Sequence, residues 1–261
     1  MASPDRTISV FKLFTIERPE WTVEEAAAAL QVSVSSAYRY FAALTDAGLL
    51  TTIVSGRYIL GPAIIQYDRQ IQLTDPLLRV AKPVMSDIKR FAPDRSTVLL
   101  CRMFRDTVLC VHQVADADGG TVVSYERGRP MPLFRGATSK IILAHLQPRD
   151  LRRFYEAHQA EFAGTAPGAG WDAFRKAMAA MRKAGYAVAR GEVDAERIGI
   201  AAPILDEAGR VQGSLSFVIS AREERAVARL VSLLIGAAHE IENGLRSGAV
   251  ELQRVAQEQA A

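Results

Sequence analysis

Residue types that often carry out catalysis are present in this chain, but their spacing does not assemble a catalytic site. The four histidines are scattered, and none lies at metal-ligand spacing from another candidate ligand. The segment HEIE that begins at His239 lacks the second histidine of a zinc-protease helix. Ser139 and Lys140 are neighbours without a third partner, and no G-x-S-x-G elbow occurs. We therefore expect no enzymatic activity, no metal and no cofactor.

The segment GATSKIILAHL has the pattern of an anion site. A loop that ends at Gly136 leads into a predicted helix whose first residues are the small Ala137, Thr138 and Ser139. Unpaired backbone amides and the positive end of the helix dipole favour an anion at such a terminus. The segment is not a P-loop, because no Gly-Lys-Ser/Thr lies at the required offset. Small residues would also let this helix pack tightly, and the two interpretations are compatible.

Another set of residues suits contact with nucleic acid. It combines small polar, tyrosine and arginine side chains: Ser35, Ser36, Tyr38, Arg39, Tyr40 and Arg57. An exposed arginine on a helix that enters a DNA groove either binds a guanine edge or clamps a phosphate, and the alternative for Arg39 is a solvated surface arginine. Tyr38 fits the core of a small domain as well as it fits DNA, and both interpretations stay open.

These residues lie on two predicted short helices. In TVEEAAAAL the apolar residues follow a helical period, and Thr22 and Glu25 have the spacing of a capping box. After a three-residue break, a second helix is predicted from Ser33 or Val34 to about Ala47. Helix, short turn and helix is the layout of a helix-turn-helix DNA reader.

Two β-rich runs follow the second helix and flank Val54-Ser55-Gly56, which predicts a hairpin, or wing. SVSSAYRYFAALTDAGLL and the later GRYILG resemble the winged helix of the IclR family of bacterial transcription regulators. In that family a Ser/Thr pair, Tyr-Arg and Gly-Arg-Tyr-x-Leu-Gly recur at this spacing. The family often has Pro-Lys/Arg where this chain has Ser33-Val34, so one expected cationic contact is missing.

The resemblance continues over nearly the whole chain and implies a small-molecule effector cavity. It rests on GATSKIILAHL and on the run from GYAVARGEVD to GSLSFVIS. By position it nominates seven cavity residues: Gly136, Ala137, Ala189, Arg197, Gly199, Ser216 and Val218. An arginine that projects into a pocket without an acidic partner calls for an anionic ligand, ideally a carboxylate. The alternative is that Arg197 is solvated or pairs with Glu192, Asp194 or Glu196.

The segments STVLLCRMF and TVLCVHQV predict a second hairpin with Arg105-Asp106 as its turn. That register places Cys101 opposite Cys110. Cytosolic thiols stay reduced, and a buried cysteine usually acts as a small hydrophobe. We therefore interpret Cys101 and Cys110 as core residues and not as a redox switch.

The order of helices and strands predicts an α+β fold in which helices cover an antiparallel sheet, similar to the GAF-like effector domain of the family. We expect four parts: a winged helix-turn-helix domain at 1–62, a linker helix at 63–74, an effector-binding GAF-like domain at 75–247 and a polar C-terminal tail at 248–261. We further expect a kink or break at Pro83, a strand over 121–125 and a flexible loop over 164–170.

Composition agrees with a DNA-binding protein that depends on oligomerisation. The 261 residues suit two domains, and 49% hydrophobic with 23% charged residues is typical of a soluble globular protein. No apolar run reaches about eighteen residues and no signal-peptide core is present, so we expect a cytoplasmic protein without membrane contact. Residues 1–62 carry five basic against six acidic side chains. Few phosphate contacts per subunit are therefore expected, and affinity would require a homodimer or homotetramer.

The predicted function is a transcription regulator whose binding to double-stranded operator DNA is controlled by a small carboxylate effector. Phe134, Phe217 and Met131 near the implied cavity favour an aromatic acid. The alternative is a ligand-binding sensor that acts through protein contacts. Exposed Ser35, Ser36 and Arg39 argue against that alternative, because a protein interface favours apolar anchors.

Overall fold

The computed structural model describes residues 4–54, 56–116, 123–162 and 170–259, and the chain divides into two compact units, Met1–Asp75 and Pro76–Ala261. Each unit is built around hydrophobic clusters of its own. The segment predicted as a linker helix groups with the first unit.

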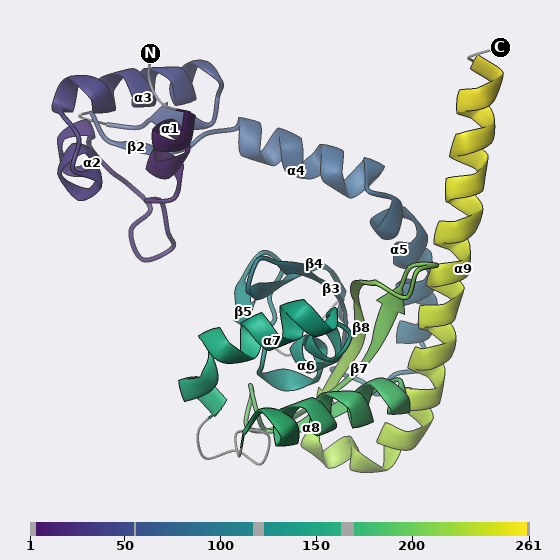
Figure 1. Cartoon of the computed structure of the whole chain (residues 1–261). Coiled ribbons are helices and arrows are strands. Elements are labelled where there is room, and N and C mark those ends of the chain that lie inside the picture. Colours follow the sequence, from purple (N-terminus) through teal and green to yellow (C-terminus); the bar gives the residue numbers. More distant parts are fainter. Residues whose placement is uncertain (1–3, 55, 117–122, 163–169, 260–261) are drawn as a thin grey trace. The chain divides into compact units, whose positions relative to one another are not determined.

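The N-terminal unit contains helices and one two-stranded hairpin (Figure 1). Its elements are α1 (Pro4–Phe11), α2 (Val23–Leu30), α3 (Val34–Asp46), β1 (Leu50–Thr52), β2 (Tyr58–Leu60) and α4 (Ala63–Thr74). Strands β1 and β2 pair antiparallel, which confirms the predicted hairpin. Ser55, in its predicted turn, lies outside the described residues.

Short polar side chains set the turn between α2 and α3. The Thr22 hydroxyl accepts from the Glu25 amide at 3.2 Å, and Oε2 of Glu25 accepts from the Thr22 amide at 3.1 Å, so the predicted capping box is confirmed. Helix α2 ends at Gln31 in the left-handed conformation, with φ of 54°. The Ser33 hydroxyl then caps α3 by accepting from the Ser36 amide at 3.2 Å.

The inward face of α3 is wider than its sequence pattern predicts. Ala37, Phe41 and Leu44 are buried, and the Phe41 ring packs edge-on against Tyr58 with a centroid distance of 4.8 Å. Tyr40, predicted to face outward, is only 4% exposed and belongs to the same core, so that prediction is wrong. Tyr40 lies three residues after Ala37 and four before Leu44, which places it on the apolar stripe of the helix.

The C-terminal unit is organised around a six-stranded antiparallel sheet with the order β5-β4-β3-β8-β7-β6. Its strands are β3 (Thr97–Phe104), β4 (Thr107–Val114), β5 (Pro130–Pro132), β6 (Ala187–Arg190), β7 (Arg197–Leu205) and β8 (Val211–Ser220). Part of the strand predicted over 121–125 lies outside the described residues, and Val123 to Tyr125 are not in a strand. The strand at this edge of the sheet is instead β5, whose first and last residues are prolines. Proline has no amide hydrogen to donate, and at an edge strand this loss is tolerated because one side of the strand has no partner.

Helices cover both faces of this sheet (Figure 1). The helical elements are α5 (Pro76–Lys89), α6 (Gly136–Ala144), α7 (Pro148–Ala157), η1 (Gln159–Phe162), α8 (Trp171–Ala184), η3 (Ala221–Ala226) and α9 (Val227–Gln259). Alternate strand residues such as Leu99 and Leu100 pack against α6, α7 and α8 on one face and against α5 and α9 on the other. Helix α5 runs through Pro83 without a break, and residues 248–259, predicted as a tail, form the last turns of α9.

The two cysteines are register partners in the β3–β4 hairpin, as predicted. Both are buried, and burial raises the pKa of the Cys101 thiol well above its ordinary value. The Cys110 thiol donates to the carbonyl oxygen of His112 at 3.3 Å.

Within the described part of the chain, no helix combines the length and the apolar character needed to cross a membrane.

Candidate DNA-reading surface and effector cavity

The outward face of α3 carries four of the predicted DNA-contacting residues: Ser35, Ser36, Tyr38 and Arg39. Tyr38 is 52% exposed and its hydroxyl donates to Oε1 of Glu24 at 3.1 Å, so it is not part of the core. Arg39 is exposed, and its Nη2 donates to the Ser36 hydroxyl at 3.4 Å. Among the described residues, no carboxylate lies within ion-pair distance of Arg39, so its charge is available to a ligand.

Two other arginines of the N-terminal unit, Arg57 and Arg18, are already engaged by acids. Arg57, immediately before β2, lies 3.3 Å from Glu20 and 3.8 Å from Glu25. Arg18 lies 3.0 Å from Glu25, and its guanidinium covers the Trp21 ring at 3.3 Å. Exposed ion pairs of this kind contribute little stability, so Arg57 can exchange its acids for a phosphate at small cost.

A small cavity lies in the C-terminal unit, at the first turn of α6. Its space for solvent is about 30 Å³, enough for roughly one or two water molecules. The lining comes from α6, the loop before β7, strands β6, β7 and β8, and one residue upstream: Tyr125, Gly136, Ala137, Thr138, Ala189, Glu192, Val193, Asp194, Arg197, Gly199 and Val218. The structure therefore brings six of the seven nominated effector residues together.

Ser216, the seventh, does not line the cavity. It is fully buried, and its hydroxyl accepts from Oγ1 of Thr138 at 3.0 Å. The Ser214 hydroxyl donates to the Thr138 carbonyl oxygen at 3.2 Å. Because Thr138 covers it, Ser216 joins α6 to β8 instead of facing the cavity, and the predicted position is wrong.

The backbone at Gly136 admits only glycine without strain. Its φ is +78°, and a Cβ there would lie 2.9 Å from Oη of Tyr125 and 2.9 Å from Cγ2 of Val193. Its amide donates to Oε2 of Glu192 at 3.1 Å, and Oε1 of Glu192 lies 2.5 Å from Nζ of Lys140. The anion site predicted at this helix start thus holds a carboxylate of the chain itself.

The alternative in which Arg197 pairs with a neighbouring acid has no support among the described residues. No ion pair of Arg197 occurs within the described residues, and its amide donates to the Asp194 carbonyl oxygen at 3.0 Å. The Asp194 carboxylate accepts from the amide and the hydroxyl of Ser124, at 3.1 and 2.5 Å. Glu192 pairs with Lys140. Glu192 and Asp194 nevertheless line the cavity together with Arg197.

Tyr125 is a cavity residue that the sequence did not reveal. Its hydroxyl donates to the Arg135 carbonyl oxygen at 2.7 Å and lies 2.8 Å from the Ser139 hydroxyl. Burial raises the pKa of this phenol, so it stays neutral. Nothing in its local sequence distinguishes it from a strand residue.

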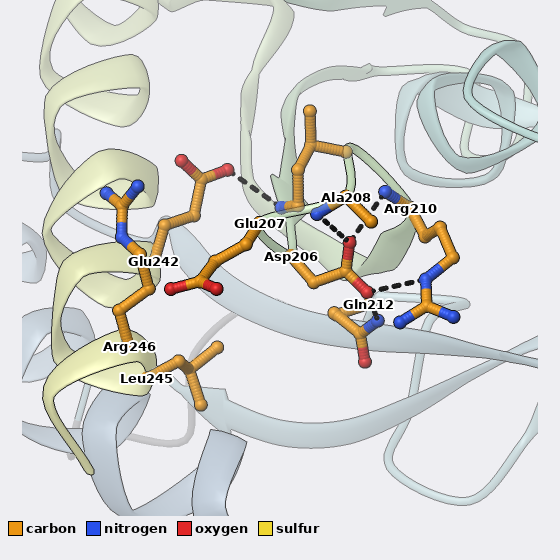
Figure 2. Close-up of a pocket in the computed structure, with 9 residues that line it drawn as sticks. Asp206, Glu207, Ala208, Arg210, Gln212, Glu242, Leu245 and Arg246 are labelled. Atoms are coloured by element: carbon orange, nitrogen blue, oxygen red, sulfur yellow. Dashed lines mark hydrogen bonds and ion pairs between the residues drawn. The ribbon is translucent and has the colours of Figure 1, made fainter. Parts of the chain in front are cut away.

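A larger depression of about 520 Å³ lies between the β7–β8 turn and α9 (Figure 2). Several of its polar groups bind one another. Asp206 accepts from the amides of Ala208 and Arg210, both at 2.9 Å, and Oε1 of Glu242 accepts from the Leu205 amide at 2.7 Å. We therefore interpret these hydrogen bonds as structural contacts that hold the β7–β8 turn and α9 in place.

Within the described residues, no three metal-ligating side chains are grouped so that they could hold an ion.

Comparison with known proteins places both units in one family. A model described as the IclR helix-turn-helix domain matches residues 3–53, and the model for the bacterial transcriptional regulator IclR C-terminal domain matches residues 72–243. The HTH-type transcriptional regulator KipR of Bacillus subtilis (strain 168) is 23% identical over 212 residues, which are 81% of this chain and 83% of KipR.

Solved structures share the fold. One is an IclR homolog from Microbacterium hydrocarbonoxydans complexed with 4-hydroxybenzoate, with a TM-score of 0.73, 24% identity, and coverage of 93% of this chain and 98% of that chain. Another is an IclR transcriptional regulator from Alicyclobacillus acidocaldarius, with a TM-score of 0.76, 19% identity, and coverage of 92% and 98%. The α+β architecture with an N-terminal helix-turn-helix is common to them. Because the C-terminal model alone matches more than half of its residues, the chain belongs to the IclR family of bacterial transcriptional regulators.

Proposed function

We propose that the chain acts in the cytoplasm as a homodimer or homotetramer that binds a double-stranded operator, and that an organic carboxylate controls this binding. The observation that carries the proposal is the outward face of α3, where Arg39 is exposed beside Ser35 and Ser36 and has no acidic partner among the described residues. An arginine of this kind can bind a guanine edge in the major groove. Arg57 on the hairpin would add a phosphate contact.

The proposed oligomer rests on α4. This helix, the proposed linker at 63–74, exposes large apolar side chains: Ile65 is 76% exposed, Leu73 57% and Ile71 53%. Apolar side chains gathered on one helix favour burial against another surface. A second copy of the chain would bury them and would set the spacing of two α3 helices, which must match half-sites about one helical turn apart.

The proposed effector class rests on the cavity at the start of α6. Two features favour an anion there: the amide of Gly136, and the guanidinium of Arg197, which makes no ion pair with any residue that the structure describes. Gly136, Ala137, Ala189, Arg197, Gly199 and Val218 remain the proposed effector-binding residues. The Microbacterium homolog was solved with 4-hydroxybenzoate, which makes that aromatic acid the first compound to test.

The test is a gel shift with the purified full chain, the intergenic duplex beside its own gene, and a scrambled duplex of equal length. We expect retardation of the first duplex only, weaker at higher salt, and changed by 4-hydroxybenzoate or another small carboxylic acid. Specific DNA binding that no acid changes would contradict a carboxylate effector but would still support a DNA-binding function.

Equal affinity for both duplexes would instead favour a sensor that acts through protein contacts. Ile53 and Val54, which are 51% and 71% exposed beside the hairpin turn, would then be its apolar anchors.

A further inference from the structure

Another pocket in the C-terminal unit shares Glu192 with the small cavity. It provides about 570 Å³ of space beside α6, η1 and α8. Its wall includes the rings of Phe134, Phe162 and Phe174, and the Phe134 and Phe162 rings meet edge-on at 5.5 Å. Lys140 and Glu192 supply charge at its border with the cavity. We call it the outer pocket.

The sizes of the two spaces decide which one can hold an organic acid. Small-molecule sites usually measure about 300–1,000 Å³. The cavity, at about 30 Å³, is far too small for a benzoate ring, whereas the outer pocket, at about 570 Å³, has room for it. Its aromatic wall also suits an apolar body, because aromatic rings pack favourably edge-on or offset.

The border between the two spaces already holds a carboxylate. Oε2 of Glu192 binds the Gly136 amide at 3.1 Å, and Oε1 binds Nζ of Lys140 at 2.5 Å. The backbone of Glu192 is fixed separately, because Nε and Nη2 of Arg135 donate to its carbonyl oxygen at 3.0 and 2.6 Å. The side chain can therefore leave while the loop stays anchored. The Glu192 side chain is 33% exposed, so it can move out into solvent.

We propose that the outer pocket holds the body of the effector, an acid with an aromatic or similarly bulky apolar group, and that the acid's carboxylate replaces Glu192 on the Gly136 amide and on Lys140. This inference rests on the proposed function and specifies its ligand site. The exchange conserves charge, because one carboxylate replaces another and Lys140 keeps an ion pair. Glu192 acts as a competitor within the chain, and the apparent affinity for the acid falls with the fraction of molecules in which Glu192 is bound.

The experiment titrates benzoate and 4-hydroxybenzoate into the full chain by calorimetry, and circular dichroism verifies that each variant is folded. Glu192→Gln keeps an oxygen for the Gly136 amide but gives up the ion pair with Lys140. We expect it to tighten binding of both acids about tenfold, because a charge-assisted competitor is lost. Lys140→Gln removes the cation that receives the acid, and we expect about tenfold weaker binding.

Glu161→Gln is the matched control. Glu161 also lines the outer pocket, but its carboxylate pairs with Nδ1 of His158 at 2.9 Å and not with Lys140. It removes the same charge from the same pocket, and we expect less than about a twofold change. Similar gains from Glu161→Gln and Glu192→Gln would reduce the effect to general charge repulsion and overturn the proposal.

Two further outcomes separate this inference from the proposed function. Acids that bind the wild type with affinities unchanged by Glu192→Gln and Lys140→Gln would overturn the outer pocket as the site and leave a carboxylate effector in place. If neither acid binds to the wild type or to Glu192→Gln, both the outer-pocket site and the proposed carboxylate effector are overturned.

Phe134→Ala tests where the apolar body of the acid binds. We expect weaker binding of benzoate and unchanged binding of acetate. Equal losses for benzoate and acetate would contradict the assignment.

Discussion

Arg39→Ala is expected to remove sequence-specific operator binding while the protein stays folded. Arg39 is exposed, and the hydrogen bond from its Nη2 to the Ser36 hydroxyl, at 3.4 Å, is its one side-chain hydrogen bond among the described residues. A bidentate arginine–guanine contact contributes about 1–3 kcal/mol of discrimination, so two subunits contribute about 2–6 kcal/mol. This corresponds to a loss of about thirtyfold or more in affinity for the specific duplex. Fluorescence anisotropy with the specific and the scrambled duplex measures it.

Arg18→Ala provides the control for that experiment. It removes the same charge from the same unit, but the Arg18 guanidinium is stacked over Trp21 and lies 3.0 Å from Glu25. We expect it to lower the free energy of unfolding and to preserve the preference for the specific duplex. If Arg39→Ala weakens binding to both duplexes equally, as the loss of a phosphate contact would, base reading by Arg39 is contradicted.

Gly136→Ala is expected to destabilise the C-terminal unit and to abolish acid binding. A residue with a side chain at φ of +78° costs about 1–2 kcal/mol of strain, and overpacking against neighbours costs about 1–3 kcal/mol more. The new Cβ would lie 2.9 Å from both Tyr125 Oη and Val193 Cγ2, inside the cavity. We therefore expect the free energy of unfolding to fall by about 2–5 kcal/mol, measured in urea.

Gly185→Ala separates strain from steric overlap. Gly185 ends α8 with φ of +75°, nearly the value at Gly136, but a Cβ there would meet no atom within 4 Å. Only the strain term applies, so we expect a loss of about 1–2 kcal/mol and unchanged acid binding. Equal losses at the two glycines would show that the contacts of Gly136 with Tyr125 and Val193 do not constrain the cavity.

Local patterns in the sequence were sufficient to predict most of the elements. The capping box at Thr22, the α2–α3 turn and the hairpin that pairs Cys101 with Cys110 depend on neighbouring residues, and all are confirmed. Tyr40 was misplaced because tyrosine is amphipathic: its hydroxyl suits an exposed site, but the position of Tyr40 on α3 puts its ring in the core.

The cavity could be predicted only in part, because its closure depends on distant residues. The helix start at Gly136 and the strand positions of Ala189 and Arg197 follow from resemblance and period. The loop that carries Glu192 and Asp194 folds back onto α6 and onto Ser124, contacts that span about fifty residues or more. No local pattern encodes such a pairing. The carboxylate already bound at the anion site therefore became visible only in the structure.

An acid bound in the C-terminal unit and the operator bound by α3 are expected to change each other's affinity for the protein. The most direct measurement is the dissociation constant of 4-hydroxybenzoate for the free protein and for the operator-bound protein, together with the operator affinity with and without saturating acid. Linkage requires the two ratios to be equal, and we predict a common factor that differs from one. An acid that binds the free and the operator-bound protein with the same affinity would contradict control of DNA binding by that ligand.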